Sequence, residues 1–131
     1  MEQDRPTLDR PTLDRPTLDQ LTERLIAFRD ARDWRQFHSL KDLIVSLNLE
    51  AAELLELTQW KSDTDFESAA QDEDVHKRLE EECADVLLYL LLITERAGID
   101  LQAAAARKIT TNDAKYPADK ARGNARKYDK L

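Results

Sequence analysis

The stretch SLNLEAAELLELTQW, residues 46–60, has the periodicity of an amphipathic helix but carries two acids where leucine is expected. Leu43, Leu47 and Leu54 recur at helical spacing and define one apolar stripe. Glu50 falls in the middle of this stripe, and Glu53 falls on its flank. A carboxylate that is buried without a partner is costly, or its pKa shifts until it is neutral. The stretch therefore predicts a helix whose inward face carries charges that another group must balance.

A second stretch, residues 75–97, repeats this pattern. Glu82 lies at the centre of an apolar band that includes Leu79 and Val86, and Asp85 borders the same band. If the two helices pack side by side, Glu50, Glu53, Glu82 and Asp85 converge. Four such anions are tolerable only around cations.

The types of these side chains indicate which ion would bind. Carboxylate oxygens without histidine or thiol at ligand spacing favour Mg²⁺, or Mn²⁺ in its place, over zinc. Neither His38 nor His76 follows a glutamate by three residues, so the Glu-x-x-His pattern of di-iron bundles is missing. The alternative is that the acids face solvent or pair with lysine and arginine, as we expect for Glu56 and Glu80.

The composition of the chain predicts an all-α fold. Among 131 residues there are two glycines and four prolines, and no proline occurs between Leu18 and Tyr116. Alternating apolar and polar runs typical of strands are missing. We expect four helices, with a loop at 62–74 and a basic tail at 117–131. Their expected ranges are 19–30, 39–60, 75–97 and 100–116.

The first 18 residues differ from the rest. Residues 4–18 are three copies of Asp-Arg-Pro-Thr-Leu, and a proline at every fifth position prevents a continuous helix. We expect residues 1–18 to be a mobile arm without chemistry and residues 19–131 to be one all-α domain. Alternatively, the arm is an extended segment that lies across a partner subunit.

Charge and cysteine content narrow the function classes. The net charge of −7 argues against a nucleic-acid binder and suits a protein that recruits cations. The single cysteine, Cys83, excludes an intramolecular disulfide, and the apolar run at 87–93 is too short to span a membrane. We expect a cytoplasmic protein that binds neither membrane nor nucleic acid. Because the leucines of 87–92 point in nearly every direction, we also expect a partner subunit to cover part of that helix.

Four segments together resemble the MazG-like nucleotide pyrophosphohydrolases, and most of all their dCTP pyrophosphatase branch. These segments are EAAELLELTQWK, EECADVLLYL, KITTNDAKYP and ARGNARKY. The resemblance implies an all-α, four-helix bundle-type fold that assembles as a dimer or tetramer with active sites built across subunits. It also implies Mg²⁺-dependent hydrolysis of a nucleoside triphosphate, such as dCTP or a modified dCTP, to the monophosphate and pyrophosphate. Glu50, Glu53, Glu82 and Asp85 would hold the metal and carry the catalysis.

The resemblance also implies a set of residues around the nucleotide. The base would lie among aromatic side chains near the two ends of the second helix, and phosphate and sugar would meet one face of the fourth helix. The expected substrate-binding residues are Trp34, His38, Trp60, Tyr89, Lys108, Asn112, Lys115, Tyr116 and Arg122.

Other functions stay open at this point. The chain departs from the dCTP pyrophosphatase branch at Leu25, where members of that branch carry a histidine, so dUTP or another nucleotide is an alternative substrate. A non-catalytic helical oligomerisation or regulatory module, whose acids only bind ions, is an alternative from a different class.

Overall fold

A computed structural model of the chain describes residues 15–130, and all regular elements in this range are helical. The all-α prediction is therefore confirmed. Residues 1–14, which make up most of the predicted arm, lie outside the described residues. The elements in chain order are α1 (Leu18–Ala31), the 3₁₀ helix η1 (Arg35–Phe37), α2 (Leu40–Glu56), α3 (Asp63–Ala69), α4 (Glu73–Ala97), α5 (Leu101–Lys115), α6 (Ala118–Ala121) and the 3₁₀ helix η2 (Tyr128–Lys130).

Local sequence signals set the ends of the long helices. At α1, the Thr17 hydroxyl accepts the Gln20 N–H at 3.1 Å while the Gln20 side chain accepts the Thr17 N–H at 2.9 Å, a complete capping box. Asp100 caps α5 by accepting the Ala103 N–H. Gly98 ends α4 with φ of 67°, a left-handed conformation that glycine adopts without strain. The ends of these three helices lie within two residues of the predicted ranges 19–30, 75–97 and 100–116.

Two of the predicted boundaries are wrong. The loop expected at 62–74 contains α3, because Ser62 caps the segment by accepting the Asp65 N–H at 3.1 Å and acids follow in its first turn. The second helix was expected to reach Trp60 but ends at Glu56. Trp60 itself has φ of 63° and is 99% exposed.

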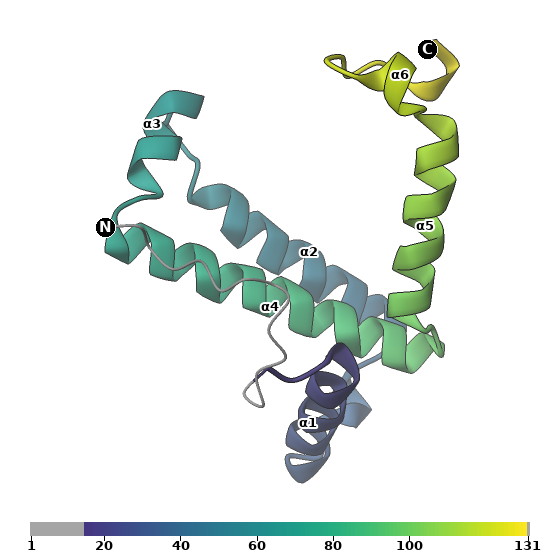
Figure 1. Ribbon diagram of the computed structural model, residues 1–131. Coiled ribbons are helices and arrows are strands. Elements are labelled where there is room, and N and C mark those ends of the chain that lie inside the picture. Colours follow the sequence, from purple (N-terminus) through teal and green to yellow (C-terminus); the bar gives the residue numbers. More distant parts are fainter. Residues whose placement is uncertain (1–14, 131) are drawn as a thin grey trace.

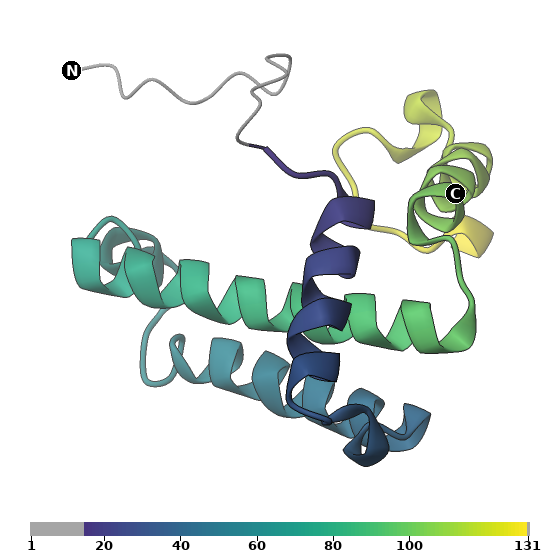
Figure 2. The ribbon, with the colours of Figure 1, turned by 90° about the horizontal axis from the view of Figure 1, so that it is seen from below.

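Three helices make up the packed part of the chain. Helices α2 and α4 lie side by side, and α1 crosses α4 (Figures 1 and 2). The most deeply buried leucines come from α2, α4 and the residue that follows α2, and they are Leu43, Leu57, Leu91 and Leu92. This arrangement holds the two acid-bearing faces of α2 and α4 against each other.

Helix α5 projects away from this core, and α6 and η2 lie at its far end (Figures 1 and 2). Residues 15–130 of one chain therefore form a three-helix core with a projecting helix, and the four-helix bundle-type arrangement expected of an oligomer stays a prediction. The reason for the projection lies in composition: α5 carries four consecutive alanines, 103–106, and then mostly polar residues, so it has little apolar surface to bury against α4.

The outer side of α2 exposes an unusual amount of apolar surface. Five large apolar side chains of α2 are each at least 39% exposed, namely Leu40, Ile44, Val45, Leu49 and Leu55. In α4, by contrast, Leu91 and Leu92 are buried and the neighbouring leucines are half-buried. Exposed apolar surface of this amount on one helix is typical of a protein–protein contact.

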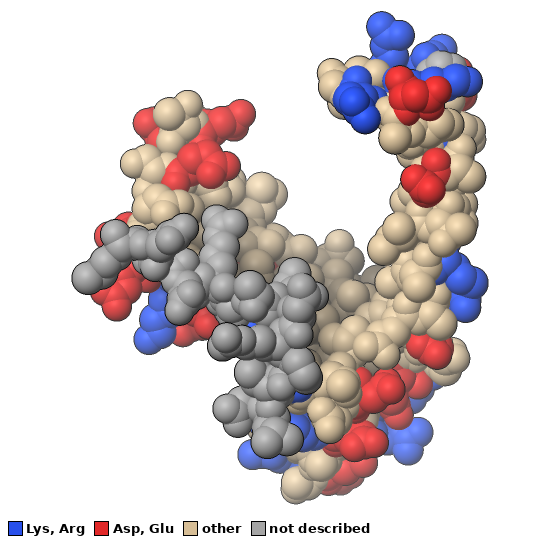
Figure 3. All heavy atoms as spheres, in the orientation of Figure 1, with Lys and Arg blue, Asp and Glu red and all other residues tan. Residues whose placement is uncertain are grey.

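The surface of the chain has a wide hollow and a basic end. In Figure 3 the hollow separates α5 from the side of the molecule formed by α2 and α3, and lysines and arginines gather at the far end of α5. Among residues 15–130, no helix has both the length and the apolar character that a membrane span needs.

Candidate functional site

Three carboxylates meet between α2 and α4. Glu50 and Glu53 come from α2 and Glu82 comes from α4, and one carboxylate oxygen of each lies within 4.8 Å of the others. The sequence pattern predicted this convergence, because Glu50 and Glu82 occupy the inward stripes of two helices that pack side by side. The spacing is short enough for a single ion to bridge all three side chains.

The local environment of these acids fits a cation. Oε2 of Glu50 and Oε2 of Glu82 are buried and have no hydrogen-bond partner among the described residues. Buried polar atoms are nearly always satisfied, so two unpaired carboxylate oxygens in one cluster need another partner. A hard divalent cation with oxygen ligands would satisfy both oxygens and offset part of the negative charge of the cluster. Asp85 is not within the same 4.8 Å set, and its role as a ligand stays a prediction.

The acids also raise one another's pKa. The pKa of Glu50 is raised by burial, by a hydrogen bond with Glu53 that needs one of the two carboxyls protonated, and by the charges of Glu53, Asp85 and Glu82. The pKa of Glu82 is raised by burial, by the charge of Glu53 and a hydrogen bond with it, and by Asp85, while Arg78 lowers it. Without a cation, the folded site therefore favours protonated carboxyls.

This predicts how stability depends on pH and metal. Because the folded state binds protons at Glu82 more tightly than the unfolded chain, the metal-free protein should lose stability as pH rises from 4.5 through the raised pKa. The Glu82→Gln variant should lose less over the same range. Mg²⁺ should raise the melting temperature of the parent at pH 7 and have little effect on that of Glu82→Gln.

Melting curves with and without Mg²⁺ between pH 4 and 8 check this prediction. Glu80→Gln is the matched control, because it removes an exposed acid from the same helix and should behave like the parent. Equal stabilisation of parent and Glu82→Gln by Mg²⁺ would contradict it.

A cavity of about 270 Å³ lies between α1, the turn after it, and α4, and Asp85 is the one predicted metal ligand among its lining residues. Trp34, His38, Asp85 and Tyr89, four of the residues predicted for the site, line this cavity. Its remaining lining residues are Leu25, Phe28, Arg29, Leu88 and Leu92. Nδ1 of His38 is buried and has no hydrogen-bond partner among the described residues, so it is free to bind a polar group. Mostly apolar walls with a few polar atoms are typical of a site for a flat organic ring.

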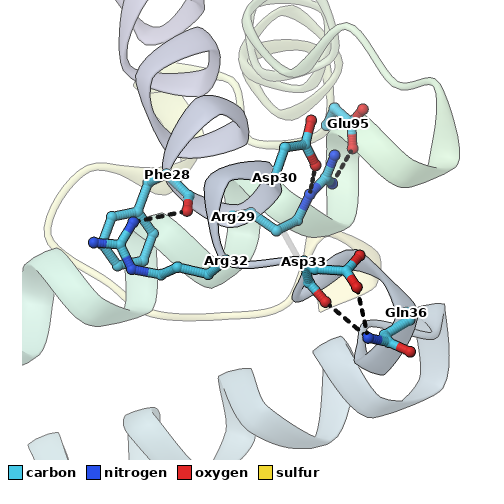
Figure 4. Close-up of polar contacts among 7 residues, drawn as sticks. All are labelled: Phe28, Arg29, Asp30, Arg32, Asp33, Gln36 and Glu95. Carbon is cyan, nitrogen blue, oxygen red and sulfur yellow. Dashed lines mark hydrogen bonds and ion pairs between the residues drawn. The ribbon is translucent and has the colours of Figure 1, made fainter.

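A buried arginine holds the cavity wall together. Arg29 is only 5% exposed, and its guanidinium donates to Asp30 at 3.0 Å and to Glu95 of α4 at 3.3 Å (Figure 4). Its backbone oxygen accepts the N–H of Trp34 at 3.1 Å. The same residue therefore ties α1 to α4 and fixes the backbone of a cavity-lining aromatic residue.

Other predicted site residues lie elsewhere in the chain. Trp60 follows α2 at its α3 end and does not line this cavity. Lys108 and Asn112 lie on the projecting helix α5, exposed to solvent. At the far end of α5, Tyr116 packs edge-on against Tyr128 with ring centroids 6.3 Å apart.

The remaining two predicted residues also lie near that far end. Lys115 places its Nζ 5.0 Å from the ring centroid of Tyr128, and Arg122 is exposed after α6. Within the described part of one chain, the predicted row on α5 and its neighbours are thus not brought to the carboxylates. Their contact with substrate stays a prediction.

The sequence reasoning missed several residues that line the cavity. Leu88 and Leu92 follow Asp85 by three and seven residues, so the same helical wheel that selected Asp85 could have found them. Leu25 and Phe28 are spaced by three residues and share one face of α1, the face that lines the cavity. Nothing in the sequence singles out Arg29 as the one charged residue of α1 that is buried.

Comparisons with known proteins identify the family of the chain. The sequence model of the MazG-like family matches residues 45–131. The chain is 42% identical over 104 residues to mouse (Mus musculus) dCTP pyrophosphatase 1 and 42% identical over 106 residues to the human (Homo sapiens) protein. Each match covers 79% of this chain and 61% of the relative, so the chain spans less than two thirds of these curated relatives.

A solved structure is similar as well. The crystal structure of a pyrophosphatase from Archaeoglobus fulgidus superposes with a TM-score of 0.72 at 39% sequence identity. The match covers 82% of this chain and 99% of the archaeal chain. The similarity therefore extends over nearly the whole of that structure.

Proposed function

The chain belongs to the MazG-like family, and we propose that it hydrolyses a deoxynucleoside triphosphate, dCTP or a modified dCTP, to the monophosphate and pyrophosphate. The named activity of its relatives supports this proposal. One observation carries it: Asp85 lines the cavity, and its charge also acts on both Glu50 and Glu82. A pocket for a flat ring and a site for a cation are thus neighbours, as a nucleotide with its base and its phosphates requires.

Glu50, Glu53 and Glu82 would hold Mg²⁺, or Mn²⁺ in its place, and Asp85 would complete the set. When bound, such an ion neutralises phosphate oxygens and makes a coordinated water more acidic. The chain's own contribution is to hold these carboxylates close together, and a bound cation would then favour their ionised form. Any carboxylate of the cluster that does not bind the ion can accept the proton of the attacking water.

The base would enter the cavity. Trp34 offers a flat ring for stacking, and His38 Nδ1 and the Tyr89 hydroxyl offer polar contacts to the base edge. Leu25 lines the same cavity, so the departure from the dCTP pyrophosphatase branch falls in the base site. The choice among dCTP, dUTP and other nucleotides is therefore made at this wall.

We further propose that the protein works as a homo-oligomer, a dimer or a tetramer. Burial of the exposed apolar side chains of α2 against another copy would be favourable. The projecting α5 also carries Lys108 and Asn112 away from the carboxylates of the same chain. In an oligomer, α5 of one copy would bring these side chains to the site of another, and Trp60 would join a partner's site in the same way. The single cysteine and the acidic net charge favour a cytoplasmic protein without nucleic-acid or membrane partners.

The test is a product assay. The parent protein is incubated with dCTP, 5-methyl-dCTP, dUTP, dTTP and dATP in Mg²⁺, and phosphorus-containing products are separated and identified. Pyrophosphate and dCMP in equal amounts support the proposal. Release of orthophosphate, or faster hydrolysis of dUTP than of dCTP, would overturn the reaction type or the substrate. No hydrolysis of any nucleotide would favour a non-catalytic helical module.

A further inference from the structure

The turn after α1 reverses the chain within three residues. Asp33 has φ of 53°, in the left-handed region that aspartate tolerates better than most residues, and its N–H donates to the Asp30 carbonyl. The next N–H, of Trp34, returns to the carbonyl of Arg29 in the last turn of α1. The reversal places the Trp34 ring beside Phe28, with centroids 5.6 Å apart and an interplanar angle of 78°.

Arg32 lies against this aromatic pair. Its guanidinium carbon is 3.7 Å from the Phe28 ring centroid and 5.9 Å from the Trp34 ring centroid. Its Nη1 donates to the Phe28 carbonyl at 2.9 Å, so the group is held at one edge by a hydrogen bond and at its face by the ring (Figure 4). A planar guanidinium can stack flat on the ring while an N–H at its edge donates to the carbonyl, a geometry that the compact ammonium of lysine does not reproduce.

The two rings form part of the cavity wall, but Arg32 does not. Phe28 is 46% exposed and Trp34 is 44% exposed with Arg32 in place, so the rest of the protein covers only about half of each residue. Arg32 supplies part of that cover, because its guanidinium lies over the Phe28 ring and near the Trp34 ring. Without it, the rings would sample more orientations, and a stacking partner would have to order them on binding.

We propose that Arg32 is a positioning residue, which holds Phe28 and Trp34 in the orientation that forms the base-binding wall and thereby sets the affinity for the nucleotide. The proposal rests on the proposed function in assigning a base to this cavity. The ordering of Trp34 by Arg32 can be measured without any substrate.

The kinetic test compares Arg32→Met and Arg32→Lys with the parent. We expect the KM for dCTP to rise about threefold to tenfold in both variants, the size of a cation–π contact, while kcat holds and the melting temperature falls by only a few degrees. Arg24→Met is the matched control: it removes an exposed arginine of α1 that has no ion pair or hydrogen bond from its side chain among residues 15–130, and its KM should equal that of the parent.

A second measurement follows Trp34 directly. In a Trp60→Phe background Trp34 is the only tryptophan, so its fluorescence anisotropy and near-ultraviolet circular dichroism report the order of this one ring. Adding Arg32→Met should lower both signals in the absence of nucleotide, whereas adding Arg24→Met should leave them unchanged.

Three results would overturn the inference. They are an unchanged Trp34 signal in Arg32→Met, a KM in Arg24→Met that rises as much as in Arg32→Met, and full recovery of the parent KM by lysine, which would indicate a simple charge contact. If the parent hydrolyses no nucleotide at all, the proposed function fails, and the Trp34 signal still decides whether Arg32 orders the ring.

Discussion

Replacing Glu50 with glutamine is expected to lower kcat/KM for dCTP hydrolysis by about a hundredfold or more. Removing a residue that only hydrogen-bonds a metal ligand already lowers metal affinity or activity by about 10- to 100-fold. Glu50 is itself one of the three converging carboxylates. The amide keeps the size of the side chain but removes the charge that attracts a divalent cation. Steady-state kinetics at saturating Mg²⁺ measure the effect.

The same variant should not be less stable than the parent. Glu50 has a raised pKa and an unpaired buried oxygen in the absence of metal, so neutralising it relieves repulsion with Glu53 and Glu82. We expect the melting temperature of the metal-free protein to hold or rise. Glu56→Gln, an exposed acid later in the same helix, is the control and should keep full activity. Activity near the parent's in Glu50→Gln would remove Glu50 from the metal site.

Co-expression of two inactive variants is expected to restore activity. If α5 of one copy completes the site of another, each site takes its carboxylates from one chain and its Asn112 from the other. Glu50→Gln and Asn112→Ala then remove residues that different chains contribute to the same site. Random pairing into dimers makes half of the assemblies mixed, and one of the two sites in each mixed dimer carries neither change. About a quarter of the parental activity should return, against a background of a few per cent or less from either variant alone.

When the two variants carry different tags, purification through both tags isolates the mixed dimers from the two homodimers. The mixed species should then show about half of the parental activity per dimer. Co-expression of Glu50→Gln with Glu82→Gln is the control, and it should restore nothing if α2 and α4 of one chain supply both carboxylates. Failure of Glu50→Gln and Asn112→Ala to complement, in assemblies shown to be mixed, would mean that Asn112 does not serve a partner's site.

The helices and the carboxylates could be predicted from sequence because both follow local rules. Thr17, Gly98 and Asp100 act on their own helix ends, and the positions of Glu50 and Glu82 follow from helical periodicity alone. Side-by-side packing of two apolar stripes then brings the acids together without further information.

The features that could not be predicted depend on tertiary contacts. Burial of Arg29 requires Glu95 to arrive from a helix more than sixty residues away. The stack of Arg32 on Phe28 depends on a single left-handed residue, Asp33, that turns the chain back. The low apolar content of α5 is visible in the sequence, but the direction in which α5 projects is set by the short connection after Gly98, which no periodicity encodes.

The most direct test of the central claim is to locate a bound ion. Crystals grown with Mn²⁺, measured at a wavelength where manganese scatters anomalously, give its position independently of any enzyme assay. We predict a peak between α2 and α4 within direct ligand distance, about 2.0–2.6 Å, of carboxylate oxygens from Glu50, Glu53 and Glu82, and no such peak in crystals of Glu50→Gln. Manganese bound only elsewhere, or a peak of equal height at this place in Glu50→Gln, would contradict the account.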